Sequence, residues 1–294
     1  MIQSLLNGVI QGLLLAVVGV AFSLVYSTTR VFHIALGAIY AVAPYVLLAA
    51  LHAGMPWFVG VGLAILACIA LGLGAEGLVH WPLERKRAPP EIHFISSLGA
   101  FLVVGQLVVL VWGNDAQVLR TGVDTVYDVA GLRATTGQLM VVVVAAAALA
   151  STFAWLRWTE VGLQFRAMAS NPSLLATLGR NVRRLRWAVF GLSGALAAIS
   201  ALAAARDVGF DPNAGMHTVL IGVAATIVGG RGSFTGAAVA GLLLGVLRAQ
   251  VVWHFSARWE DATTFVLLAI FLVFAPGGLQ SLTARRTIRV EDAA

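Results

Sequence analysis

The sequence is short of charged residues and of cysteine. Only 11% of its 294 residues are Asp, Glu, Lys or Arg, whereas a soluble domain carries about a quarter. So few charges cannot cover a water-exposed surface of this size, which excludes a soluble enzyme and a disordered chain. The one cysteine, Cys68, lies within an apolar run, which excludes a disulfide framework and a thiolate metal cluster. The histidines are scattered and none share i, i+4 spacing, so we expect no metal site.

Two further features are missing. No Lys or Arg precedes Arg30, whereas a secretory signal needs a positive region ahead of its apolar stretch. We therefore expect the first apolar run to be retained as a helix. The formal net charge is +6, but the basic residues lie between hydrophobic runs and form no contiguous patch, which argues against nucleic acid as a partner.

Apolar residues make up 60% of the chain, with a mean hydropathy of +0.91, 31 glycines and 8 tryptophans. A helix needs about 20 mostly apolar residues to cross a bilayer. Sliding that window along the chain predicts an all-α polytopic membrane bundle of about nine spans, forming a single domain over residues 1–294. The predicted spans are 6–26, 34–52, 57–79, 92–112, 137–157, 184–205, 216–230, 235–255 and 262–280.

Two of these spans contain residues that disfavour a continuous helix. The segment near 216–230 is the shortest and ends in Gly229-Gly230, which makes it the candidate for a broken or re-entrant helix. Pro44 is expected to interrupt the second span. Small residues also let helix backbones approach closely in lipid. The glycines assigned to helix packing are Gly229, Gly230, Gly232 and Gly236.

The distribution of basic residues predicts the orientation, because cytoplasmic loops are enriched in Lys and Arg. If the loop with Arg85, Lys86 and Arg87 is cytoplasmic, alternation of the spans places most other bases on that side, with the N-terminus outside and the C-terminus inside. Those bases are Arg30, Arg157, Arg166, Arg180, Arg183, Arg184, Arg186, Arg231, Arg285, Arg286 and Arg289. The opposite side receives Arg120, Arg133, Arg206 and Arg258.

The loop at 113–136 combines acidic with β-prone residues. The acids are Asp115, Asp124 and Asp128, and the β-prone residues are Val123, Val126 and Tyr127. This mixture predicts a small hairpin that covers the outer face.

The segment near 158–183 predicts two short amphipathic helices parallel to the membrane. Apolar residues recur at helical spacing at Phe165, Met168 and Ala169, and again at Leu174, Leu175 and Leu178. Asn171 is expected to cap the second helix, with Pro172 as its first residue and Gly179 at its end. The apolar faces favour two interpretations about equally: a helix pair lying on lipid headgroups, or a docking element for the groove of a soluble partner.

The runs Arg166-Ala167-Met168-Ala169-Ser170-Asn171 and Leu178-Gly179-Arg180-Asn181 resemble the cytoplasmic coupling segment of branched-chain amino acid ABC transporter permeases of the LivH type. The resemblance continues over most of the chain in the family's order. The other matching stretches are 24–33 (LVYSTTRVFH), 211–215 (DPNAG), 228–237 (VGGRGSFTGA), 241–245 (GLLLG) and 275–279 (APGGL). One stretch departs from the family: its usual N-F-A-H-G is replaced here by His33-Ile34-Ala35-Leu36-Gly37, in a candidate lining of the translocation path, which leaves the substrate open.

The resemblance implies one half of an importer in the bacterial inner membrane, translocating branched-chain or other hydrophobic amino acids or a related small polar solute. It implies a second homologous permease, two cytoplasmic ATP-binding subunits and a periplasmic substrate-binding protein as partners. The chain has no G-x-x-x-x-G-K-[ST] phosphate loop, so ATP and Mg²⁺ are expected on the partner subunits, with no cofactor and no catalytic residue here. The residues assigned to ATPase coupling are Arg166, Ala167, Met168, Asn171, Pro172 and Gly179, with Met168 as the apolar anchor.

Four residues are candidates for the translocation path. Gln11 lies on a polar stripe with Gln3 and Asn7, and polar groups in hydrocarbon must turn toward protein or water. Each such residue therefore either lines a path or bonds to a neighbouring helix. Arg248 lies inside a span and is expected to face the bundle interior. The full set is Gln11, His33, Gln106 and Arg248.

Two other functions stay open. A secondary transporter without ATPase partners needs ionisable pairs in the membrane for ion coupling, and only Arg248 and Glu76 qualify. Glu76 is itself interpreted as structural, because it lies close enough to the cytoplasmic side to snorkel or to meet the basic loop at 85–87. Gly191-Leu192-Ser193-Gly194 resembles the G-x-S-G of rhomboid intramembrane proteases, with His254 as the base, although small-residue runs are ordinary helix-packing sequence in membranes.

Overall fold

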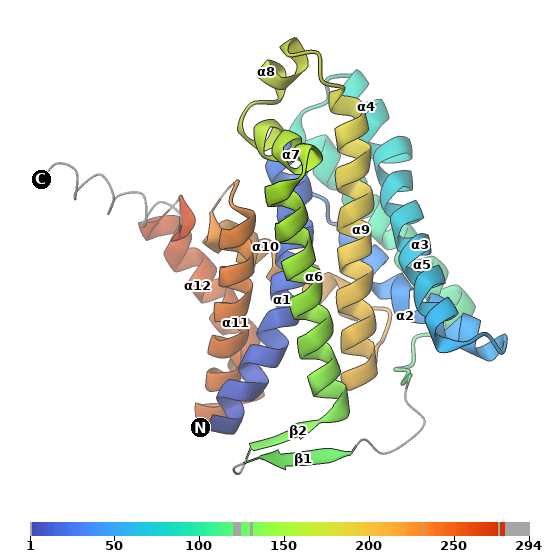
Figure 1. Ribbon diagram of the computed structural model, residues 1–294, viewed down its shortest axis with the longest axis vertical. Helices are drawn as coiled ribbons and strands as arrows, with labels where there is room; N and C mark the ends of the chain where they lie inside the picture. The colour runs from blue at the N-terminus through green and yellow to red at the C-terminus, as the bar shows by residue number, and fades with distance from the viewer. Residues whose placement is uncertain (1, 120–124, 130–131, 231, 276, 280–294) are drawn as a thin grey trace, which may run out of the picture.

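A computed structural model describes residues 2–119, 125–129, 132–230, 232–275 and 277–279. The chain forms a helical bundle with one β-hairpin at its end (Figure 1). The helices are α1 (Ile2–Thr29), α2 (Leu36–His52), α3 (Trp57–Gly74), the π-helical η1 (Ala75–His80), α4 (Trp81–Arg85), α5 (Pro90–Trp112), α6 (Thr136–Trp158), α7 (Glu160–Ser170), α8 (Pro172–Thr177), α9 (Val182–Asp207), α10 (Ala214–Gly229), α11 (Phe234–His254), the 3-10 turn η2 (Ala257–Trp259) and α12 (Glu260–Phe274).

The prediction of a polytopic helical membrane protein is confirmed, but nine full spans are not. Within the described residues, 6 helices are long and apolar enough to cross a membrane: α1, the continuous helix Trp57–Arg85, α5, α6, α9 and α11. The helices α2 and α10 are apolar but shorter, with 17 and 16 residues, and α12 has 15. The second span is also not interrupted, because α2 runs unbroken through Pro44. Likewise α10 is continuous up to Gly229, so the glycine pair marks the end of this helix and not a break within it.

Two helices form the centre of the bundle. The most apolar stretches of α1 and α9 are 72% and 67% buried, whereas that of α5 is only 17% buried. The helix α1 packs against α6, α9, α10 and α11. Its approach to α11 depends on missing side chains, because a Cβ on Gly245 would overlap the backbone of Gly12. The peripheral helices therefore turn most of their apolar surface outward, as expected for helices that contact lipid.

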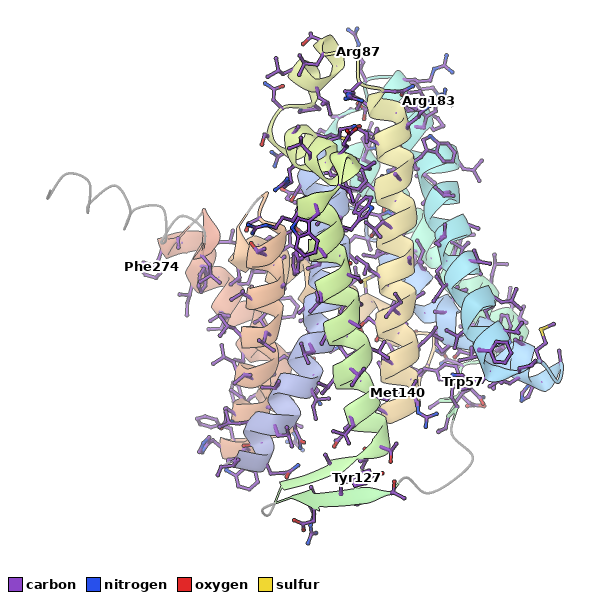
Figure 2. The ribbon with its side chains drawn as sticks, viewed as in Figure 1. Trp57, Arg87, Tyr127, Met140, Arg183 and Phe274 are labelled. Carbon is purple, nitrogen blue, oxygen red and sulfur yellow. The ribbon has the colours of Figure 1, made fainter. Side chains whose placement is uncertain are left out.

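The bundle has two distinct ends. At one end lie the short helices α7 and α8; Arg87 and Arg183 are at this α7–α8 end (Figure 2). At the other end, strand β1 (Val126–Val129) pairs antiparallel with β2 (Leu132–Thr135), which confirms the predicted hairpin, although Val123 and Asp124 lie outside the described residues. Thr135 then caps α6 in a reciprocal capping box with Gln138. We call this the hairpin end.

Candidate functional site

The helix pair α7–α8 is built by local capping. The Thr159 hydroxyl accepts a hydrogen bond from the Gly162 amide at 3.0 Å, which starts α7. Asn171 ends α7, and its side-chain oxygen accepts from the Leu174 amide at 3.1 Å to start α8, with Pro172 as the first residue. Gly179 follows the helix with a φ of +76°, a backbone conformation that favours glycine. The two short helices and the residues that bound α8 are thus as predicted, whereas the Thr159 cap of α7 was not.

The apolar stripe of α7 does not face outward, so Met168 is not available as the apolar anchor that the sequence suggested. Phe165 and Met168 are 0% and 1% exposed and belong to the core that α1, α6 and α9 share. The Phe165 ring also packs edge-on against Trp155, with centroids 5.3 Å apart. A side chain this deep in its own chain is not a free anchor for a partner. Met168 instead fixes α7 onto the bundle.

Other residues of the helix pair remain at the surface. Leu163, Leu174 and Leu178 are 59%, 58% and 71% exposed. The predicted coupling residues Arg166, Asn171, Pro172 and Gly179 are exposed as well, and Ala167 is half-buried. We call Leu163, Arg166, Leu174 and Leu178 the α7–α8 surface. It combines apolar side chains with one positive charge.

A cavity of about 800 Å³ lies beside this surface. Arg157 and Arg166 line it from α6 and α7, and the hydroxyls of Ser233 and Thr235 line it from the start of α11. The fold therefore brings one coupling candidate, Arg166, to the turn after α10, and makes this recess cationic and polar.

A chain of buried histidines lies nearby, and spacing in the sequence did not reveal it. His33 Nδ1 is 3.3 Å from His80 Nε2, and His80 Nδ1 is 3.3 Å from His93 Nδ1. The three side chains come from the α1–α2 loop, η1 and α5, and Phe190 of α9 packs against two of them. Their relative exposures are at most 4%. Among the described residues, no group of three or more ligands has metal-binding geometry.

The three imidazoles are linked by these two N···N contacts of 3.3 Å, in which the tautomers decide which nitrogen donates. Glu84 lies 4.0 Å from His93 Nε2, which is beyond hydrogen-bond distance. His33 Nε2 is buried and has no hydrogen-bond partner among the described residues. The three histidines therefore form a buried row that runs toward a carboxylate.

The same cluster contains a buried ion pair, which corrects the interpretation of Glu76. Arg186 of α9 donates from Nε and Nη2 to the two Glu76 oxygens, at 2.6 and 3.2 Å, and from Nη1 to Glu84 at 3.2 Å. Glu76 is 0% exposed and neither snorkels nor meets the loop at 85–87. One sequence signal could have found this face: Glu76, His80 and Glu84 follow at four-residue intervals, like the polar stripe of α1.

A second buried arginine lies toward the hairpin end. Arg248 of α11 donates from Nε to Glu260 at 3.1 Å and from Nη1 to Thr264 at 3.0 Å, and its Nη2 is 3.1 Å from Asp261. His217 of α10 lies 2.7 Å from Asp261. This contact, followed by the charge of Arg248, holds the pKa of Asp261 at the exposed start of α12 below its usual value. Arg248 thus faces protein, as expected.

The four path candidates do not converge on one site. Gln11 is exposed on α1 and lines a cleft of about 340 Å³ with Asn7, Trp253 and Glu260. Because Glu260 also pairs with Arg248, this cleft connects two of the candidates. His33 is buried in the histidine chain, and Gln106 lies on the exposed face of α5. The fold therefore separates His33 and Gln106 from the cleft.

The packing glycines fall into two kinds. A Cβ on Gly229 would overlap the backbone of Gly236, and one on Gly236 would overlap the Gly229 carbonyl. Gly230 and Gly232 instead have φ values of +107° and +92°, which an L-residue adopts only with strain. The tight α10–α11 connection therefore uses one pair for close approach and the other for backbone conformation.

Ser193 is not arranged as a nucleophile. It is fully buried, and its hydroxyl donates to the Ala21 carbonyl at 2.8 Å, whereas His254 is exposed at the end of α11. A Cβ on Gly194 would overlap the Cys68 carbonyl, so this G-x-S-G run brings α9 against α3. The geometry fits helix packing and not the protease interpretation.

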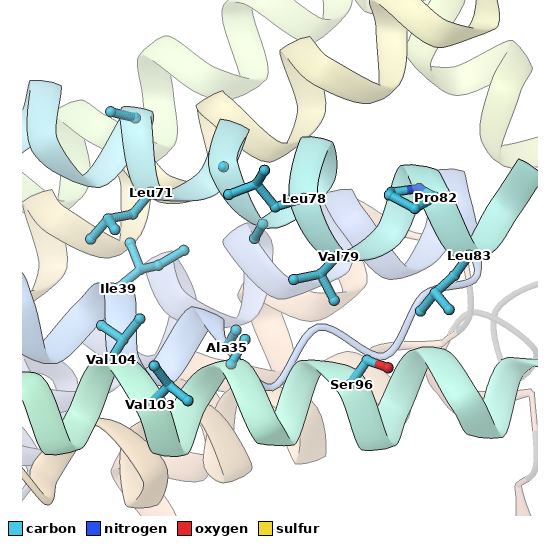
Figure 3. A pocket seen from close by; sticks show the side chains of 14 residues that line it. Ala35, Ile39, Leu71, Leu78, Val79, Pro82, Leu83, Ser96, Val103 and Val104 are labelled. Atoms are coloured by element: carbon cyan, nitrogen blue, oxygen red, sulfur yellow. The ribbon is translucent and has the colours of Figure 1, made fainter.

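A groove of about 560 Å³ lies between α3–η1 and α5 (Figure 3). Leu78 and Val79 lie on one wall and Val103 and Val104 on the other, and Ser96 supplies the only hydroxyl among the lining side chains. A polar solute finds almost no hydrogen-bond partner there, so this groove is unsuited to line a path for such a solute.

A family model described as "Branched-chain amino acid transport system / permease component" matches residues 4–275. The high-affinity branched-chain amino acid transport system permease protein LivH of Escherichia coli (strain K12) is 25% identical over 291 residues, covering 95% of this chain and 94% of that protein. BraD of Pseudomonas aeruginosa, which has the same description, is 25% identical, with 95% of each chain covered.

The similarity extends to a transporter with a different cargo in its name. The autoinducer 2 import system permease protein LsrC of Escherichia coli O9:H4 (strain HS) is 25% identical over 262 residues, covering 84% of this chain and 71% of that protein. Among solved structures, PsaBC from Streptococcus pneumoniae in complex with Fab matches with a TM-score of 0.52 and 14% identity, covering 94% of this chain and 91% of that chain. At this identity the match indicates a shared fold.

Proposed function

Because the chain belongs to the family of branched-chain amino acid transport system permease components, we propose that it is the membrane-spanning half of an ABC importer. In this proposal it pairs with a second homologous permease, two cytoplasmic ATP-binding subunits and a periplasmic substrate-binding protein. ATP and Mg²⁺ bind to the partner subunits, and this chain carries no catalytic residue. The observation that carries the proposal is the family match over almost the entire chain.

The proposed docking site for the ATPase is the α7–α8 surface. Leu174 on α8 and Leu178 directly after it are the exposed apolar contacts, and Arg166 supplies charge from α7. Asn171, Pro172 and Gly179 set the angle and length of the two helices through their capping geometry. Met168 acts from beneath by holding α7 on α1 and α9.

The proposed cargo is a branched-chain or other hydrophobic amino acid, or a related small polar solute. The names of LivH and BraD support this class. The polar cleft with Asn7, Gln11 and Glu260 offers hydrogen bonds to such a solute. We propose that this cleft contributes to the path where the two permease halves meet.

The proposed orientation places the α7–α8 end in the cytoplasm of a bacterium and the N-terminus outside. It is supported by the positions of basic residues, because Arg87, Arg166 and Arg183 all lie at the α7–α8 end. Of the remaining bases, Arg231, Arg285, Arg286 and Arg289 lie outside the described residues. Arg120, which the sequence assigns to the opposite side, also lies outside them.

One observation favours a second candidate, an ion-coupled carrier that works without ATPase partners. The cluster of three histidines with Glu76, Glu84 and Arg186 contains more buried ionisable groups than the sequence suggested. Ion-coupled carriers use such groups within the membrane. The two candidates differ in whether transport requires a docked ATPase.

The test is to replace Leu174 or Leu178 by Asp in the assembled transporter. Both side chains are exposed, so we expect normal insertion and thermal stability. A charge in an apolar contact should remove a binding hot spot, which typically contributes 2 kcal/mol or more, so the ATPase subunits should no longer co-purify and uptake of radiolabelled leucine should cease. Val208→Asp is the matched control, because Val208 is 81% exposed at the hairpin end. Unchanged ATPase recovery and uptake in the Leu174 and Leu178 variants would contradict the docking proposal.

A further inference from the structure

A second cleft, of about 480 Å³, lies between α3, α6 and α9. Its lining is aliphatic over most of its length, for example at Ile65, Met140 and Leu202, and the Ser151 hydroxyl there already donates to the Ala148 carbonyl at 3.1 Å. All three helices are long and apolar enough to cross a membrane. The cleft therefore opens to hydrocarbon, where an apolar recess suits a lipid chain better than a polar solute.

One charged side chain lines this cleft, at its hairpin end. Arg206 is in the last turn of α9, and its guanidinium carbon lies 5.7 Å from the centre of the Trp57 ring at the start of α3. Its Nε is buried and has no hydrogen-bond partner among the described residues. A buried donor without an acceptor is costly, and more so when it carries charge. Figure 2 shows Trp57 and Met140 at the end of the bundle that carries Tyr127 of the hairpin.

We propose that this Arg206 cleft binds an anionic glycerophospholipid of the leaflet at the hairpin end. One acyl chain lies along the groove over α9, and the phosphate accepts hydrogen bonds from the Arg206 guanidinium. The planar guanidinium fork matches the geometry of a phosphate. Trp57 is the first residue of α3, and tryptophan is enriched at the ends of membrane-spanning helices. The site requires only that α3, α6 and α9 cross a membrane, so it does not depend on the proposed transport function.

A lipid fits these observations better than an apolar helix of a partner subunit. An apolar helix would cover the aliphatic lining and leave the Arg206 donor without an acceptor. A phospholipid supplies an acyl chain for the lining and an anion for the arginine at the same time. Binding to the folded state alone also stabilises that state, in proportion to the logarithm of ligand concentration.

Native mass spectrometry of the purified full chain can test the charge in this site. Phosphatidylglycerol and phosphatidylcholine with identical acyl chains are added in turn to delipidated protein. We expect one phosphatidylglycerol to bind at least tenfold more tightly than phosphatidylcholine, and Arg206→Gln to remove this preference. Arg258→Gln is the matched control, because Arg258 is an exposed arginine at the same end but does not line the cleft. Equal affinity for the two lipids in the unmodified chain, or an equal loss in Arg258→Gln, overturns the proposal.

A second pair of variants tests the groove without changing charge. Ala147 lines the cleft and Ala146 does not, although both are exposed on α6. Ala147→Phe should fill the groove and lower binding of both lipids at least tenfold, whereas Ala146→Phe should leave it unchanged. Phosphatidylglycerol with brominated chains should quench the fluorescence of Trp57, and the Trp57→Phe variant gives the signal of the other tryptophans that must be subtracted. Such quenching places the lipid in the cleft. Glycerol phosphate, which has no acyl chains, should not compete with the lipid for binding. Equal binding in the two alanine variants, or a Met140→Cys crosslink to a partner subunit in an assembly that retains no lipid, overturns the site.

Discussion

The two arginines that are buried among the described residues each pair with two carboxylates but lie in different surroundings. Arg186 and Arg248 are each 6% exposed in their side chains, and each contacts two carboxylates. Glu76, the main partner of Arg186, is 0% exposed, whereas Glu260, which pairs with Arg248, is 28% exposed. The Arg186–Glu76 ion pair is therefore closed to solvent, whereas solvent can reach the carboxylate that pairs with Arg248.

This difference follows from where each arginine lies in the bundle. Arg186 belongs to α9, one of the two central helices, and its partners come from the continuous η1–α4 helix that packs beside it. Arg248 belongs to α11, and its partners lie at the start of α12, which packs against α10 and α11. When one partner of a buried ion pair is lost, water cannot solvate the charge that remains. The same substitution should therefore lower the free energy of unfolding more at the α7–α8 end.

The largest expected effect is that of Glu76→Gln. This change keeps the shape of the side chain but removes the buried partner of Arg186 and leaves it only Glu84, which is 49% exposed. Breaking a buried ion pair typically costs about 3–5 kcal/mol in the free energy of unfolding. Thermal unfolding in detergent measures it. Glu91→Gln, at an exposed glutamate in the first turn of α5, is the control. A loss no larger than that of the control would show that the pair is not sealed.

A double variant sharpens the same point. Glu76→Leu combined with Arg186→Met removes both charges, and apolar replacement of a complete buried pair is often neutral. We therefore expect the double variant to be more stable than either single one. If it is less stable than both, the pair contributes net stability beyond compensating its own desolvation.

An intermediate effect is expected for Arg248→Met. The change removes hydrogen bonds to Glu260 and Thr264, and hydrogen bonds of charged groups contribute about 1.5–3 kcal/mol. The carboxylates that remain are reachable by water, so the loss should stay below that of Glu76→Gln. The same unfolding measurement compares them. An equal or larger loss for Arg248→Met would reverse the comparison of the two ends.

The smallest effect is expected for His217→Asn. The side chains of His217 and Asp261 are 52% and 54% exposed, and exposed ion pairs typically contribute about 0.2–1 kcal/mol. Salt should weaken this contribution, because exposed charges are screened. Unfolding at low and at high ionic strength checks both statements. A salt-independent loss above this range would mean that the contact is buried in the assembled protein.

The sequence by itself determined several features that depend on local chemistry, although Pro44 does not interrupt α2 as its residue type suggested. Low charge and long apolar runs give a membrane bundle, and the cap at Asn171 with Pro172 and Gly179 gives α7 and α8 their boundaries. The hairpin before α6 was predicted for the same reason, from β-prone residues in a polar loop. In each case the residues that decide the outcome are neighbours along the chain.

Only the tertiary structure decided which faces meet. Helical spacing placed Met168 on an apolar face, but it did not show that α1 and α9 cover this face. Glu76 finds Arg186 across 110 residues of sequence, and His33, His80 and His93 converge from three separate elements. In a bilayer the apolar surface of a helix can face lipid or protein at similar cost, so hydrophobicity alone does not choose the partner. The choice comes from close backbone approach and from pairing of buried polar groups, and both depend on residues distant in sequence.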